Sequence, residues 1–458
     1  MLHPIELVLA LLAVVVALGV AARRLGVAEP ILLVVGGLVL GLQPWAPGVA
    51  LDPQLVFLLF LPPLLYAAAF RTQWPDFRAQ LRPIVLLAVG LVLFTATAVA
   101  LVAHYVVGLP WAVAFVLGAI VSPPDAVAAV AVTRRLRVPR LVVTILEGES
   151  LVNDASALVT LRVAVAAVVT GAFSLVDAGV QFVLVGAGGV ALGVAGAWLA
   201  VRLHAWLDRN DRADSKLTIT VTLLTPYAVY LTAEHLHLSG VLAAVSAGLW
   251  VGNRCEQVFS AALYEEARAV WEWIEFLLNG LIFLLVGFAL RNILENLTGA
   301  YAPEDLLVHA GAVVAAVVVA RLVWMFPGAY VPRWFDRNVL GAATPYPPWQ
   351  SVTVVGWAGM RGVVSLAAAL ALPLTTADGR PFPGRDLILF LTFCVIFATL
   401  VGQGLTLPVL IRGLGVTKPA GEEEGESSEQ SDSARGGAGR ADMVGRTEDL
   451  VERRRSCD

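Results

Sequence analysis

The feature that most limits what this chain can fold into is a long series of apolar stretches separated by short polar ones. A helix needs about 20 mostly apolar residues to cross the hydrocarbon of a bilayer. Thirteen stretches meet or approach this requirement, near residues 5–22, 30–43, 53–70, 83–106, 111–133, 141–170, 175–204, 217–234, 237–252, 262–290, 304–325, 349–373 and 386–412. The sequence therefore predicts an all-α polytopic membrane protein with about 13 transmembrane helices.

The composition agrees with a membrane protein and argues against several other classes. Charged residues make up 14% of the 458 and apolar residues 58%, whereas about 25% of an average soluble protein is charged. The net charge is −4 with no basic stripe, which argues against nucleic-acid binding. Three widely spaced cysteines predict neither a disulfide framework nor a metal site. No P-loop, dinucleotide fingerprint or nucleophile elbow is present, so we expect neither an enzyme nor a cofactor.

The distribution of basic residues predicts how the spans are oriented. If the N-terminus lies outside, the inner loops hold most of the loop arginines and lysines, including the run from Arg134 to Arg140. The outer loops then hold only Arg291, Arg380 and Arg385. Because basic loops stay in the cytoplasm, we expect an odd number of spans in a plasma (inner) membrane, with the N-terminus outside and the C-terminus cytoplasmic. The first stretch lacks a preceding basic region, and we expect it to remain as a span.

Thirteen spans divide naturally into six, one linker and six. Two six-span units separated by a single span enter the membrane in opposite orientations, which is the inverted-repeat plan of many transporters. We predict a first repeat over 1–170, a linker span over 171–216, a second repeat over 217–412 and a disordered cytosolic tail over 413–458. In this plan the fifth span corresponds to the twelfth, and we expect these two to be broken helices that cross.

The fifth span carries two prolines and a carboxylate near mid-membrane. It reads Ser122-Pro123-Pro124-Asp125, and the prolines remove two backbone donors and disfavour helix at Ser122. We expect the helix to stop near Ser122 and to restart near Asp125, where free N–H groups would lie beside the carboxylate. Broken backbone at this depth occurs where it is buried in protein or lines a wet cavity, so a simple kink with a capping aspartate is the less favoured interpretation.

The sixth span places several oxygen-bearing side chains at the same depth. At about 100° per residue, Glu147, Ser150 and Asp154 share one face, and Glu149 and Asn153 line the adjacent one. Carboxylate and hydroxyl oxygens suit a hard cation. No histidine or cysteine accompanies them, which argues against zinc or copper.

The twelfth span is interrupted by glycines around an arginine. Gly356, Gly359 and Gly362 fall within seven residues and surround Arg361. Interruptions in corresponding spans of two repeats are a good sequence indication of a transport site. We expect Arg361 to be a fixed positive charge close to the two carboxylates. The alternative is that the glycines only permit close helix packing.

The other ionisable residues of the spans are expected to form structural pairs. Arg321 lies near the inner end of the eleventh span, at the depth of Glu149, which predicts a buried ion pair between them. Glu147 and Arg162 have two interpretations. Each is a member of a structural pair, or it acts on ions close to Asp154.

Taken together, these motifs resemble those of the monovalent cation/proton antiporter-1 family, the sodium/proton exchangers, and especially its bacterial NhaP-type members. The likeness covers about residues 5–412. It rests on the stretches at 61–66, 122–127, 146–154, 275–279, 320–321 and 359–362. The resemblance implies a homodimer, an elevator-like motion and electroneutral exchange.

The resemblance also implies roles for individual residues. Asp154 would be the essential carboxylate that binds either the cation or the proton. Asp125 and Ser150 would help to form its site, and Glu149 would pair with Arg321. Relatives with two adjacent aspartates are electrogenic, whereas this chain has Asn153 before Asp154.

Two positions depart from the pattern of the family. Many members carry an acidic residue where this chain has Ala67, and a threonine where it has Pro124. The carbonyl of Pro124 could still contact an ion, but no hydroxyl is present there. The choice among Na⁺, K⁺ and Li⁺ therefore stays open.

The sequence thus predicts a secondary antiporter in a lipid bilayer that exchanges Na⁺, or else K⁺ or Li⁺, for H⁺. A cation would bind ionised Asp154, and a proton would neutralise it on the return step. Apart from the transported cation, no metal is expected. Two alternatives remain: a cation channel, which needs a continuous wet pore, and a non-transporting cation or pH sensor that signals through the acidic tail.

Overall fold

The described part of the chain is almost entirely helical. The computed structural model describes residues 4–44, 53–171, 174–209, 215–258, 260–297, 301–339, 341 and 345–416. Within these ranges the only β pairing is an isolated bridge between Thr375 and Pro381, which confirms the predicted all-α class. From residue 417 onward, the predicted disordered tail lies outside the described residues.

A helical segment lies at each of the predicted spans. The segments are α1 (Pro4–Leu25), α2 (Glu29–Gly41), α3 (Pro53–Arg71), α4 (Trp74–Ala79), α5 (Leu81–Val85), η1 (Leu86–Leu91), α6 (Val92–Tyr105), α7 (Trp111–Val121), α8 (Ala126–Arg135), α9 (Arg140–Thr170), α10 (Leu175–Arg209), α11 (Ser215–His235), α12 (Gly240–Val258), α13 (Ala261–Leu297), α14 (Pro303–Asn338), α15 (Trp349–Trp357), α16 (Val363–Leu370), α17 (Arg385–Phe397), η2 (Ala398–Gln403) and α18 (Gly404–Gly413). Among the described residues, eight helical spans are long and apolar enough to cross a membrane, and α2 and most of α3 are shorter apolar helices. The count of thirteen spans stays a prediction.

The structure differs from the sequence-based boundaries in three places. The short helix α4 begins with Pro75 in its first turn, between two predicted spans. Helices α13 and α14 contain 37 and 36 residues and continue past the apolar stretches that defined them. A helix ends where its backbone is capped or broken, not where its side chains become polar, so hydropathy underestimates such lengths. The π-helical turns η1 and η2 also lie inside predicted spans.

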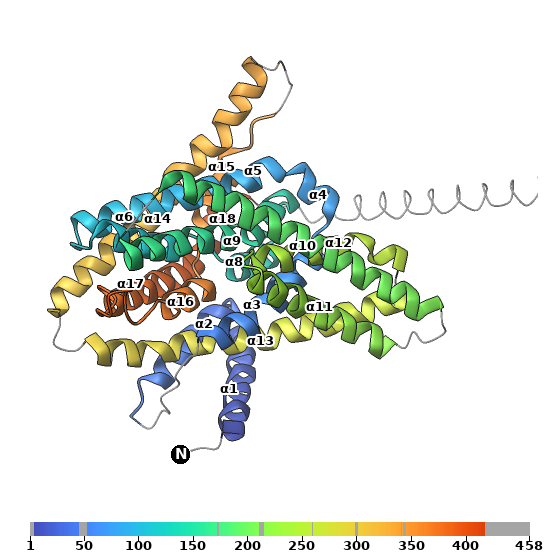
Figure 1. Ribbon diagram of the computed structural model, residues 1–458, viewed down its shortest axis with the longest axis horizontal. Coiled ribbons are helices and arrows are strands. Elements are labelled where there is room, and N and C mark those ends of the chain that lie inside the picture. The colour runs from blue at the N-terminus through green and yellow to red at the C-terminus, as the bar shows by residue number, and fades with distance from the viewer. Residues whose placement is uncertain are drawn as a thin grey trace, which may run out of the picture.

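Two broken helices meet in the middle of the bundle. Residues 122–125 separate α7 from α8, and residues 358–362 separate α15 from α16. The backbone N–H of Asp125 donates to the carbonyl of Met360 at 2.7 Å, so the two interruptions touch. Figure 1 shows α8 and α9 near the centre, with α10, α11 and α12 on one side and α6, α14 and α17 on the other. The breaks predicted in the fifth and twelfth spans are therefore confirmed.

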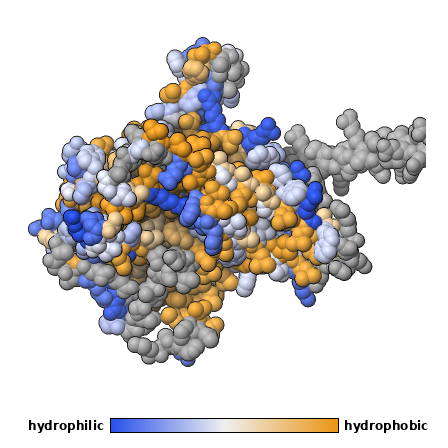
Figure 2. Space-filling model, in the orientation of Figure 1, coloured by the Kyte–Doolittle hydropathy of each residue, from blue (hydrophilic) through white to orange (hydrophobic). Residues whose placement is uncertain are grey.

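Apolar side chains fill the centre of the bundle and also cover much of its outside. Leu117 and Ile120 of α7 are fully buried in one cluster with Phe283 of α13 and Leu391 of α17. On α10, by contrast, a row of apolar side chains points outward, and Val176 is 74% exposed. Figure 2 shows apolar side chains over much of the visible face. Such a surface is typical of helices that face lipid.

Candidate functional site

The restart of the first broken helix is capped by two of the predicted site residues. Asp125 is the N-cap of α8, and its Oδ1 accepts a hydrogen bond from the N–H of Val127 at 2.8 Å. The N–H of Ala126 donates to Oγ of Ser150 on α9 at 3.4 Å. The free donors at a helix start need such acceptors inside a membrane. These contacts hold α8 beside α9 and place Asp125 next to Ser150.

The second broken helix lies directly on the Asp125 carboxylate. A Cβ atom added to Gly362 would be only 1.7 Å from Oδ2 of Asp125. No side chain can therefore be accommodated at residue 362 without moving the carboxylate. The glycine thus permits a close approach, as well as weakening the helix.

Asp154 shares a cavity with Asp125 and Ser150. The cavity has a volume of about 300 Å³, and Glu147, Asp154 and Gly362 are also among its lining residues. Asp154 is 6% exposed. No residue in the described ranges forms a hydrogen bond or an ion pair with its carboxylate. A buried carboxylate without a counter-charge needs a proton or a cation, and this arrangement leaves Asp154 free to accept either.

Pro124 and Asn153 contact each other beside this cavity. Nδ2 of Asn153 donates to the carbonyl oxygen of Pro124 at 2.8 Å. Pro123, rather than Pro124, is among the residues that line the cavity. The Pro124 carbonyl, predicted from the sequence as an ion ligand, therefore binds the Asn153 amide in this conformation. Asn153 ties the break to α9.

Glu149 and Arg321 form the buried ion pair expected from the sequence. The Arg321 guanidinium donates to both carboxylate oxygens, at 2.6 and 2.9 Å, and both side chains are 1% exposed. The same guanidinium donates to the carbonyls of Val355 and Gly356, at 3.0 and 3.1 Å. Arg321 thereby satisfies carbonyls at the end of α15, a role that the sequence did not indicate.

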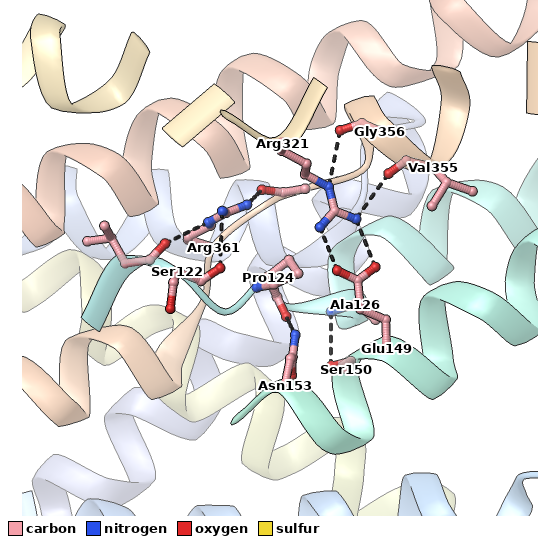
Figure 3. A network of polar contacts seen from close by, with 12 residues as sticks. Ser122, Pro124, Ala126, Glu149, Ser150, Asn153, Arg321, Val355, Gly356 and Arg361 are labelled. Atoms are coloured by element: carbon pink, nitrogen blue, oxygen red, sulfur yellow. Dashed lines mark hydrogen bonds and ion pairs between the residues drawn. The ribbon is translucent and has the colours of Figure 1, made fainter. Parts of the chain in front are cut away.

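Arg361 has the equivalent position at the end of the other half-helix. It donates to the carbonyls of Val121 and Ser122, at 2.9 and 3.2 Å, and to that of Gly359. Its own backbone N–H donates to Oγ1 of Thr399, which lies in the π-helical turn η2. Figure 3 shows the two guanidinium groups at the two broken ends.

The sequence predicted Arg361 as a charge beside the two carboxylates, and its contacts are different. In the described part of the chain its side chain binds three backbone carbonyls and no carboxylate. The last carbonyls of a helix have no partner within the helix, and inside a membrane they need one. Buried arginine is well suited to supply several donors at once. The need of helix-end carbonyls for donors inside a membrane is therefore the feature from which the role of Arg321 and Arg361 could have been predicted.

The other charged residues near the cavity form ion pairs. Glu147 pairs with Arg134 at 2.6 Å. Arg162 donates to both carboxylate oxygens of Glu234, at 2.8 and 3.0 Å. Of the two interpretations left open for Glu147 and Arg162, the structure thus places each in a pair.

Two residues that line the cavity were not identified as site residues from the sequence. Glu275 and Asn279 of α13 both line the cavity that contains Asp154, and Glu275 pairs with Arg71 of α3 at 2.6 Å. Both belong to a motif that carries the family resemblance, and their spacing of four residues places them on one helix face. The four-residue spacing of Glu275 and Asn279 is thus the sequence feature from which both could have been predicted as site residues.

Sequence comparison relates the chain to known exchangers. It matches the family described as "Sodium/hydrogen exchanger, transmembrane" over residues 9–413. An uncharacterised Na⁺/H⁺ exchanger of Mycobacterium bovis is 37% identical over 412 residues, which are 88% of this chain and 73% of that protein. A sodium, potassium, lithium and rubidium/H⁺ antiporter of Bacillus pumilus is 33% identical over 409 residues, or 88% of this chain and 60% of that one.

Structural comparison agrees with this assignment at the level of the fold. The sodium proton antiporter MjNhaP1 from Methanocaldococcus jannaschii superposes with a TM-score of 0.68 at 20% sequence identity. The match covers 90% of this chain and 98% of that protein. The chain is a multi-pass membrane protein that belongs to the sodium/hydrogen exchanger family.

Proposed function

We propose that this cation/proton antiporter exchanges its two substrates by competition at a single carboxylate, that of Asp154. The observation that carries the proposal is the isolation of this group. Asp154 is buried in a cavity, and the nearby arginines bind Glu149 or backbone carbonyls instead. An ionised carboxylate in such a position is costly unless a cation balances it. A cation and a proton are therefore alternative ways to neutralise the same charge.

Competition at one group is sufficient to couple the two fluxes. The cation would bind Asp154 with oxygens from Asp125 and Ser150, and water would complete its coordination in a cavity of about 300 Å³. A proton would replace it on the opposite side of the membrane. Each crossing then carries one positive charge on one carboxylate, and Asn153, which is neutral, adds none. We therefore propose electroneutral exchange.

The ligand set favours monovalent cations without strong discrimination among them. The three side chains offer oxygen atoms only, and Ala67 and Pro124 provide neither a further carboxylate nor a hydroxyl. The Bacillus pumilus relative bears a name that includes sodium, potassium, lithium and rubidium. We propose Na⁺ as a substrate, with K⁺ and Li⁺ accepted at the same site.

The proposed orientation has the N-terminus outside and the C-terminus in the cytoplasm of a bacterial-type inner membrane. Arg23, Arg71 and Arg135 come from three different loops that the distribution of charge predicts to be cytoplasmic. They line one common cavity of about 510 Å³. Their convergence supports a single inner face, onto which the site opens in this conformation. We also propose a homodimer, which the resemblance to the family implies. We propose two inverted repeats with a linker span as well, supported by the breaks in the fifth and twelfth spans.

The experiment that tests this proposal is exchange by the Asp154→Asn variant in proteoliposomes. Asparagine has nearly the shape of aspartate but neither ionises nor takes up a proton at neutral pH, so we expect exchange of Na⁺ for H⁺ to be lost while the protein still folds. Glu147→Gln is the control, because Glu147 lines the same cavity but already has Arg134 as a partner. Retained exchange in Asp154→Asn would overturn the proposal. Cation flux without proton counter-flux in the unmodified protein would instead identify a channel.

A further inference from the structure

The cavity that contains Asp154 adjoins a second, larger cavity. The second cavity has a volume of about 510 Å³ and lies among α1, α2, α8 and α13. Five residues line both cavities: Arg71, Val127, Ala131, Glu275 and Asn279. Arg71 and Glu275 are the ionisable members of this shared set. A cation that moves from the larger cavity toward Asp154 must therefore pass an arginine–glutamate pair.

This pair is accessible rather than sealed. The guanidinium of Arg71 meets both oxygens of Glu275, at 2.6 and 2.7 Å. The side chains are 27% and 13% exposed, in contrast to the 1% of Glu149 and Arg321. Nε of Arg71 is buried and has no hydrogen-bond partner in the part of the chain that the structure describes. Among the described residues, Arg71 is the one hydrogen-bond partner of the Glu275 carboxylate, at the junction of the two cavities.

Helix α13 presents a row of oxygen-bearing side chains along this route. Glu272, Glu275 and Asn279 are spaced three and four residues apart, which places them on one face of the helix. Glu272 lines the larger cavity, whereas Glu275 and Asn279 line both. Among the described residues, none forms a hydrogen bond with the Asn279 side chain. A carboxylate and a free amide oxygen are suitable ligands for a monovalent cation.

We propose that Glu275 and Asn279 form a second cation site, which the transported ion occupies before it reaches Asp154. The arriving cation takes the place of the Arg71 guanidinium at the Glu275 carboxylate, with the Asn279 oxygen as a further ligand. The cation then passes into the smaller cavity. The inference rests on the proposed role of Asp154 as the destination of the ion.

A second arginine–glutamate pair provides a matched control. Glu147 pairs with Arg134 at 2.6 Å, as Glu275 does with Arg71. Both glutamates line the cavity of Asp154, but Glu147 does not line the larger cavity. Glu147→Gln therefore removes an ion pair of the smaller cavity whose two members do not line the larger one.

The first test measures the half-saturating Na⁺ concentration for exchange separately from each face, in everted and in right-side-out vesicles. We expect Glu275→Gln to raise it about tenfold from the face onto which the larger cavity opens, as for the loss of one close charge contact, and to leave the other face unchanged. Asn279→Ala, which retains the ion pair, should shift the same face in the same direction. Glu147→Gln should produce no such one-sided shift. The inference would be overturned if Glu275→Gln changed the half-saturating Na⁺ concentration equally from both faces, or if Asn279→Ala left it unchanged. Glu275 and Asn279 would then have only a structural role.

The second test separates this inference from the role of Asp154. Binding of radioactive Na⁺ to purified Asp154→Asn protein should reveal residual weak binding, because the second site remains. The double variant Asp154→Asn with Glu275→Gln should lose it. Absence of residual binding in an exchange-deficient Asp154→Asn protein would contradict the second site alone. Exchange that persists in Asp154→Asn would instead contradict the role of Asp154.

Discussion

The backbone N–H of Asp125 donates a hydrogen bond to the carbonyl of Met360 at 2.7 Å, so the two broken helices are joined at the residue that also caps α8. Around this contact, the open helix ends are satisfied by side chains from other elements. Arg361 binds carbonyls at the end of α7, and Arg321 binds carbonyls at the end of α15. The guanidinium groups of Arg321 and Arg361 thus bind backbone carbonyls and Glu149. Asp154 is therefore left free to bind a substrate ion.

The close approach of Gly362 to Asp125 predicts that an added methyl group abolishes exchange. In Gly362→Ala the new Cβ atom would lie 1.7 Å from Oδ2 of Asp125, so the carboxylate or the break must move. We expect loss of exchange with normal insertion into the membrane, measured as dissipation of a pH gradient by Na⁺ in proteoliposomes. Gly311→Ala in α14 is the control, because no atom lies within 4 Å of a Cβ added there. Normal exchange by Gly362→Ala would contradict this geometry.

Substitution of Arg361 by lysine distinguishes a carbonyl-binding role from a role as a nearby charge. Lysine retains the charge but cannot reach the carbonyls of Val121 and Ser122 with two separate groups, as the guanidinium does. We expect Arg361→Lys to lower the free energy of unfolding by about 1–3 kcal/mol, the cost of a buried acceptor left unpaired. The midpoint of thermal unfolding in detergent measures this change. Unchanged stability and unchanged exchange would favour the charge-balancing role predicted from the sequence.

Arg162 is expected to have little influence on the binding of the ion. It pairs with Glu234 through both carboxylate oxygens and is absent from the residues that line the Asp154 cavity. Because the side chains of Arg162 and Glu234 are 48% and 34% exposed, the contribution of this ion pair is small, about 1 kcal/mol or less. Arg162→Gln should therefore leave the half-saturating Na⁺ concentration within about twofold of the original value. A tenfold change in that concentration would mean that Arg162 acts on ions at the site.

Competition predicts a specific dependence of Na⁺ affinity on pH. If proton and cation bind the same carboxylate, the half-saturating Na⁺ concentration should rise as the pH falls through the titration of the site, approaching about tenfold per pH unit in the acidic limit. The sign follows because protonated Asp154 cannot bind a cation. Initial rates of exchange at a series of Na⁺ concentrations and pH values measure this slope. A half-saturating concentration that does not change with pH would exclude competition.

Local chemistry made part of the site predictable from the sequence. The break between Ser122 and Asp125 follows from two prolines, whose effects on the backbone are confined to their neighbours. The pair of Glu149 and Arg321 follows from their matching depth, because few charges lie at that depth. Helical periodicity also placed Ser150 and Asp154 on one face, and both line the same cavity.

The remaining features depend on which helices are neighbours, and periodicity does not contain that information. Two of the three acceptors of Arg361, the carbonyls of Val121 and Ser122, lie at the end of α7, about 240 residues earlier in the chain. Arg71 and Glu275, which come together at the junction of the cavities, are 204 residues apart. The lengths of α13 and α14 were also underestimated, because hydropathy reports the thickness of the hydrocarbon and not the end of a helix.

The most direct test of the central claim is a count of the protons released when Na⁺ binds to the purified protein in weakly buffered detergent solution. If Asp154 is the group for which the two ions compete, the unmodified protein should release one proton for each Na⁺ bound, at a pH where that group is protonated and at Na⁺ concentrations too low to fill the weaker second site. The Asp154→Asn variant should release none at the same Na⁺ concentration. Binding of Na⁺ to the unmodified protein without release of a proton, or unchanged release in Asp154→Asn, would contradict the account.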